Sequence, residues 1–157
     1  MIDRPARKRA AEAIRHFVTG QISNKEFLRR YPESEDDSAI WALDDTVWCL
    51  YDDIRTHKLS GDEALSKEFK SEAVRWLMFL YSDKEYLWPN IGKPGFRHYP
   101  SWFCRLFVFA SKRYERFRAA GDYSVWPFLR REDFEDARQR PVLLGATSNN
   151  GMQRTRN

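Results

Sequence analysis

The sequence predicts an all-α fold, a single-domain bundle of five or six helices. Apolar residues recur at spacings of three and four along most of the chain, as one face of an α-helix requires. No segment shows the strict apolar–polar alternation, bounded by turns, that indicates a half-buried strand. The chain has 157 residues, the size of one domain. We therefore expect a helical domain over residues 1–140 and a disordered tail over 141–157, where apolar periodicity is lost.

The stretch 73–81 is predicted to lie at the centre of the core. Eight of its nine residues are apolar or aromatic, and Arg75 is the only charged one. The pattern begins upstream at Leu65 and predicts a helix that ends near Ser82. A helix that is apolar nearly all round is normally buried among other helices. Because aromatic residues make up 15% of the chain, we expect a core built largely from rings.

Capping signals place the remaining helices. Asp3 is a suitable N-cap for a first helix over 3–19, and Gly20 is a good stop. Ser23 and Glu26 form a capping box that begins a second, short helix. Further helices are expected at 39–57, 101–120 and 130–138, with a long irregular connection over 83–100 and an ordered apolar loop over 122–129.

Charge is divided unevenly along the chain. Residues 1–32 carry a net charge of +5, residues 33–88 carry −8, and residues 89–157 carry +7. The acidic and basic segments either complement one another within the fold or form separate patches that face partners. The sequence leaves both interpretations open.

The strongest candidate site lies on the predicted helix 39–57. Trp41, Asp45, Trp48 and Asp52 recur at i, i+4, i+7 and i+11, opposite the apolar stripe, and Asp44 flanks them. Indole faces and carboxylates together can bind a cation, such as a basic side chain of a partner protein or a small amine. Alternatively, the tryptophans belong to a second core layer. The aspartates lack the dense oxygen cluster of a calcium or magnesium site, so no metal is expected.

Arg75 is included among the candidate site residues because the core helix could bring it to the Trp–Asp face of the predicted helix 39–57. It either pairs locally with Glu72 or Glu68, or reaches Asp45 or Asp52 across the helix interface. The sequence does not decide between these two arrangements.

Two further groups are candidates for binding anions. Arg97, His98 and Tyr99 lie in a proline-rich loop that either holds an anion or is a packed connector. Arg105, Lys112 and Arg116 form a basic ridge that could contact nucleic-acid phosphates together with Arg4, Arg7, Lys8 and Arg9. The acidic residues over 33–63 would repel phosphates, so nucleic-acid binding is not the expected function.

No catalytic template is present. The three histidines are far apart in sequence, and no nucleophile-elbow, Walker or C-x-x-C motif occurs. We therefore lean away from an enzyme and expect no cofactor. Cys49 and Cys104 lie in apolar patterns without a secretory signal, which predicts buried, reduced thiols and a cytoplasmic location. No apolar run reaches 18 residues, so no membrane span is expected.

The run from Ser148 to Asn157 resembles the translated edge of an integron recombination site. This resemblance covers ten residues and implies that the gene is carried on a mobile bacterial cassette. It implies no fold, activity or site residue. The alternative is a basic tail that binds a partner. The body of the chain is similar to small helical bacterial proteins of unknown function.

The leading hypothesis is a protein-interaction module, of the immunity or antitoxin-like kind, that presents an acidic surface to a basic partner. The residues assigned to that surface are Asp36, Asp37, Asp44, Asp45 and Asp52. One alternative is a small-ligand binder or enzyme with an aromatic pocket between helices 39–57 and 101–120. Another is a nucleic-acid binder that uses the basic ridge. The oligomeric state is open, and a homodimer is compatible with the sequence.

Overall fold

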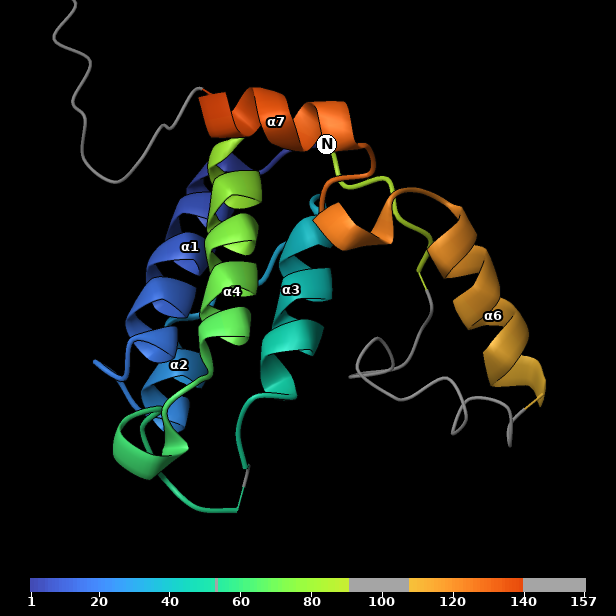
Figure 1. The fold of residues 1–157 in the computed structure, drawn as a ribbon. Helices are drawn as coiled ribbons and strands as arrows, with labels where there is room; N and C mark the ends of the chain where they lie inside the picture. Colours follow the sequence, from blue (N-terminus) through green and yellow to red (C-terminus); the bar gives the residue numbers. More distant parts are fainter. Residues whose placement is uncertain (53, 91–107, 140–157) are drawn as a thin grey trace, which may run out of the picture.

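The computed structural model describes residues 1–52, 54–90 and 108–139 (Figure 1). These residues form six α-helices and no strand, which confirms the all-α prediction. The α-helices are α1 (Arg4–Val18), α2 (Asn24–Arg30), α3 (Ser38–Trp48), α4 (Lys67–Tyr81), α6 (Val108–Ala119) and α7 (Arg131–Gln139). Two short 3₁₀ turns, η1 (Gly61–Glu63) and η3 (Tyr123–Val125), interrupt the connections.

The bundle is organised around the packing of α1 against α4. α1 also packs against α2 and α3, and α7 crosses the end of α4 (Figure 1). The contact face of α1 is rich in small residues, because Ala6, Ala10 and Ala13 are at most 2% exposed. Small side chains on α1 allow neighbouring helices to approach closely, and the larger rings of those helices pack against them in the core.

The stretch 73–81 supplies the buried face of α4, as predicted. Ala73, Trp76, Phe79 and Leu80 are buried in the core. The expectation of burial nearly all round is wrong for the opposite side, where Val74 is 51% exposed. α4 therefore lies at the side of the core with one face outward.

The capping signals are confirmed. The Asp3 carboxylate accepts a hydrogen bond from Ala6 N, and Ser23 and Glu26 form a complete capping box. Gly20 adopts a φ of +70°, and a Cβ at this position would lie 2.8 Å from Leu59 O. The turn after α1 therefore needs glycine both for its conformation and for its close approach to the loop before η1.

The predicted helix 39–57 is shorter than expected, because α3 ends at Trp48. The amides of Cys49 and Leu50 bond three residues back, to Thr46 O and Val47 O, which tightens and closes the last turn. Beyond it, the buried Asn24 side chain holds the backbone in a loop: its Nδ2 donates to Asp52 O and Arg55 O, both at 2.8 Å. These tertiary hydrogen bonds replace the helical ones, and Ile54, expected on the apolar face, is 94% exposed.

The apolar loop 122–129 is ordered and buried, as predicted. Val125, Trp126 and Phe128 are at most 5% exposed. Trp88 fastens this loop, since its Nε1 donates to Pro127 O at 3.0 Å and to Phe128 O at 3.2 Å, and its ring packs on Phe117 of α6. The described part of the irregular connection, 83–90, contains no helix or strand.

Several predictions fall outside the described residues. They include the rest of the connection, the first part of the helix expected over 101–120, and the tail over 141–157. Among the helices that are described, none is long and apolar enough to cross a membrane.

Candidate functional site

Three residues of α3 form the candidate site, and we refer to Trp41, Asp44 and Trp48 as the Trp–Asp strip. They are spaced i, i+3 and i+7, so they follow one another along one side of the helix. Both tryptophans are 44% exposed, whereas Ile40, Leu43 and Val47 of the same helix are buried. Trp41 and Trp48 are therefore only partly buried.

Asp44 lies half-buried between the two tryptophans. Burial raises the pKa of its carboxyl above the ordinary value, and the neighbouring Asp45 carboxylate raises it further. Within residues 1–52, 54–90 and 108–139, no cationic side chain pairs with this carboxylate. The strip therefore contains a negative charge that the described fold does not compensate.

The pKa of Tyr31, which follows the last residue of α2, is affected by the same buried environment. Its hydroxyl donates to Ile40 O at 2.8 Å, so the ring packs against α3. Burial raises the pKa of Tyr31, and the nearby charges of Asp44 and Asp37 raise it further. The Asp44 and Asp37 carboxylates therefore lie close enough to the Tyr31 hydroxyl to disfavour its ionised form.

The structure does not bring the other two predicted aspartates to the strip. Asp45 is only 6% exposed, because its position turns toward the buried side of α3. Asp52 lies beyond the end of the helix, where its Oδ1 accepts from Ile54 N at 2.7 Å and its Oδ2 lies 3.6 Å from Arg55 Nε. Of the five acids proposed for the surface, only Asp44 lies with the two indoles on one side of α3, whereas Asp36 and Asp52 are exposed outside that helix.

Arg75 does not join the strip. Its Nε donates to Trp126 O at 3.0 Å, and its Nη2 lies 4.0 Å from the Glu72 carboxylate. The local pair is therefore formed, and the alternative pair across to Asp45 or Asp52 is not. Arg75 ties α4 to the buried loop 122–129.

Asp37 and Arg7 were assigned to an acidic surface and a basic ridge, and both assignments are wrong. Arg7 is 1% exposed and Asp37 is 2% exposed, and they form an ion pair with Nε–Oδ2 at 2.5 Å and Nη2–Oδ1 at 3.1 Å. Arg7 shares the buried face of α1 with Ala10 and Ile14. An arginine at an apolar position was the sequence signal for this pair, because a buried charge requires a partner.

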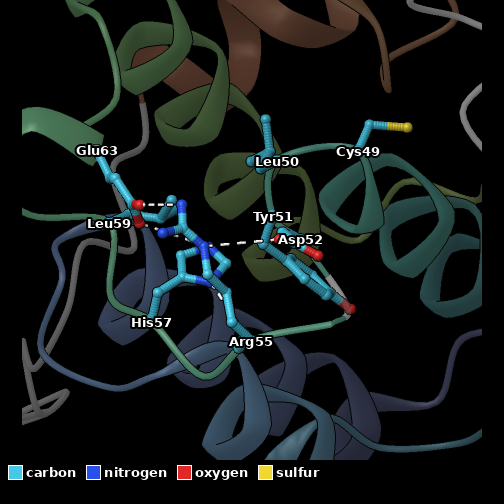
Figure 2. Close-up of a pocket in the computed structure, with 8 residues that line it drawn as sticks. All are labelled: Cys49, Leu50, Tyr51, Asp52, Arg55, His57, Leu59 and Glu63. Atoms are coloured by element: carbon cyan, nitrogen blue, oxygen red, sulfur yellow. Dashed lines mark hydrogen bonds and ion pairs between the residues drawn. The ribbon is translucent and has the colours of Figure 1, made fainter.

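A second feature is a hollow of about 400 Å³ just beyond the C-terminal end of α3 (Figure 2). Arg55 donates to Glu63 at 2.5 Å, and His57 Nε2 lies 3.8 Å from the same carboxylate. Asn24 fixes this loop, since its Oδ1 accepts from His57 N at 3.1 Å. The lining residues are Cys49, Leu50, Tyr51, Asp52, Arg55, His57, Leu59 and Glu63.

Among the described residues that line the hollow, no nucleophile–base pair is present. Cys49 is exposed, contrary to the expectation of a buried thiol, and its Sγ lies 3.7 Å from Asp45 O. Figure 2 shows the Cys49 side chain directed away from the group formed by Arg55, His57 and Glu63. The polar groups of the hollow therefore bind one another rather than converge on an open position.

The candidate anion sites are only partly described. Arg97, His98, Tyr99 and Arg105 lie outside the described residues. Lys112 and Arg116 are exposed on α6, whereas Arg4 forms an ion pair with Asp83. Nowhere in the described ranges do three or more His, Cys, Asp or Glu side chains form a group that could hold a metal ion.

Comparisons of the chain with family models, with curated proteins and with solved structures gave no match. The function must therefore be inferred from the side chains themselves.

Proposed function

We propose that the chain is a protein-interaction module, of the immunity or antitoxin-like kind, which binds a basic partner through the Trp–Asp strip. One observation carries this proposal: the half-buried Asp44 carboxylate has no cationic partner among the described residues and lies between two half-exposed tryptophans. A partner that brings a cation to this position supplies the missing charge and covers both indoles.

The energetics of the strip favour a binding role. A half-buried carboxylate without a cation lowers the stability of the free protein, because burial disfavours its charged form. Residues that lower stability in isolation are typical of functional positions. Tryptophan is also among the residues that contribute most strongly to protein interfaces, and its ring face attracts cations.

The aromatic pocket expected between helices 39–57 and 101–120 involves residues 101–107, which lie outside the described residues. A small-ligand site in the hollow would have to displace existing pairs, because Arg55 already binds Glu63 and lies close to Asp52. Neither Trp41 nor Trp48 lines that hollow. A nucleic acid approaching α3 would meet the Asp44 charge, which repels phosphates.

A cassette origin remains a proposal that concerns the gene rather than the fold. The resemblance of residues 148–157 to a translated recombination site supports it. An imperfect inverted repeat after the stop codon is the expected observation, and DNA without such a repeat would contradict it.

The function is tested by affinity capture with the full chain and three baits: wild type, Asp44→Asn and Asp62→Asn. Asp62 is exposed in η1 and provides a matched control with the same change of charge. We expect a basic protein to be retained at 50 mM salt by wild type and Asp62→Asn, and to be lost with Asp44→Asn or at 500 mM salt. Equal retention by all three baits would refute the proposed surface.

A further inference from the structure

We propose that the group bound by the Trp–Asp strip is the guanidinium of an arginine on the partner's surface, rather than a lysine ammonium or a metal ion. This inference rests on the proposed function and specifies the chemistry of the partner. It follows from the spacing of the strip, from the exposure of its members, and from the way in which the same chain binds its own arginines.

The spacing places an indole on each side of the carboxylate. Trp41 precedes Asp44 by three residues and Trp48 follows it by four, and such positions are neighbours on a helix, with about 5–6 Å between their Cβ atoms. A group that binds Asp44 therefore contacts one or both rings. A flat cation suits this position, because it can stack on an indole while its edge donates to the carboxylate.

The partial burial of Asp44 discriminates between cations. Arginine is more weakly hydrated than lysine, and its planar fork can donate two hydrogen bonds to one carboxylate. A lysine ammonium is a compact and strongly hydrated charge, so it loses more on entering a half-buried position between rings. A calcium or magnesium ion requires six or more oxygen ligands, and the two indoles supply none.

The protein binds its own Arg7 by the same combination of groups. The Arg7 guanidinium donates to both oxygens of Asp37, and its Cζ lies 5.0 Å from the centre of the Phe79 ring. On α6, Arg118 lies over the rings of Tyr114 and Tyr123, at 6.0 and 5.5 Å. The half-buried Asp44 and the half-exposed Trp41 supply the carboxylate and a ring of this arrangement, and no guanidinium of the described residues pairs with that carboxylate.

The test uses four peptides of the form acetyl-Gly-Ser-X-Ser-Gly-amide, in which X is arginine, lysine, trimethyl-lysine or citrulline. Their dissociation constants for the full chain are measured by NMR, from the indole N–H signals of Trp41 and Trp48, which single Trp→Phe variants assign. We expect the arginine peptide to bind about five to ten times more tightly than the lysine peptide, since it forms an additional charge-assisted hydrogen bond. Citrulline, which is planar but uncharged, should cause no shift.

The outcomes separate this inference from the proposed function. Equal binding of the arginine and lysine peptides, or a preference for the trimethyl-lysine peptide, overturns the inference but not the proposed binding of a basic partner. No shift of either indole with any cationic peptide overturns both. Asp44→Asn should abolish arginine binding while Asp62→Asn retains it, and unchanged signals from the buried Trp88 and Trp126 show that each variant is folded.

Discussion

Replacement of Arg7 by methionine should strongly destabilise the protein. The pair of Arg7 with Asp37 is nearly inaccessible to solvent, and Arg7 Nη1 also donates to Ser82 O at 3.3 Å and to Lys84 O at 2.8 Å. Methionine keeps much of the side-chain volume but leaves the buried Asp37 carboxylate without its cation. Removal of one partner of a buried ion pair costs about 3–5 kcal/mol. For a domain of this size that corresponds to a fall in melting temperature of about 6–20 °C.

The assay is urea unfolding of wild type, Arg7→Met, Asp37→Asn and the double variant, followed by circular dichroism. The double variant should be destabilised by clearly less than the sum of the two single variants, because it leaves no unpaired charge in the core. A loss below about 1 kcal/mol in Arg7→Met, or strict additivity in the double variant, would refute a buried, coupled pair.

Three further substitutions test single tertiary contacts of the fold. Asn24→Ala should lower the free energy of unfolding by about 2 kcal/mol and make the loop after α3 sensitive to limited proteolysis, because its backbone loses several hydrogen bonds; an unchanged cleavage pattern would argue against this anchor. Arg75→Met should cost only about 1 kcal/mol, the contribution of one hydrogen bond to Trp126 O; a loss several times larger would indicate the cross-helix pair instead. Trp88→Phe keeps a ring on α6 but removes the indole donor from the loop 122–129, so a loss of about 1–2 kcal/mol in urea unfolding is expected, and a neutral effect would disprove the role of that donor.

Much of the fold could be predicted because its signals are local. Asp3, the capping box at Ser23 and Glu26, and the apolar face of α4 act within one or two helical turns of their own positions. The end of α3 could not be predicted in this way. The pattern of α3 continues past Trp48, and the chain leaves the helix where the Asn24 side chain, distant in sequence, takes over its backbone hydrogen bonds.

The candidate site was predicted only in part, for the same reason. Helical periodicity placed Trp41 and Trp48 on one side of a helix with Asp44 flanking them, and all three residues lie on the helix that forms. It failed for Asp52, which lies beyond the end of that helix. It also failed for Asp45, because periodicity gives the direction of a side chain but not the position of the neighbouring helix that buries it.

The stability of Asp44→Asn as a function of pH provides a separate check on the charge of the strip. The pKa of Asp44 is raised in the folded state, so the ionised carboxylate lowers the free energy of unfolding at pH values above this folded-state pKa. The destabilisation disappears as the pH falls through the folded-state pKa, because the carboxyl becomes protonated. The difference in stability between the variant and wild type should therefore be present at pH 7 and diminish toward pH 4.

Thermal unfolding of wild type and Asp44→Asn, with and without the arginine peptide, tests the central claim most directly. Without peptide, Asp44→Asn should melt about 1–2 °C above wild type, since removal of a partly screened, unpaired charge is worth about 0.5 kcal/mol. At ten times its dissociation constant, the peptide should stabilise wild type by about 1.4 kcal/mol, or about 3–6 °C, and leave the variant unchanged. The account is contradicted if Asp44→Asn melts below wild type without peptide and if the peptide raises the melting temperature of the variant as much as that of wild type. Asp44 is then an ordinary structural residue, and the strip is not the binding site.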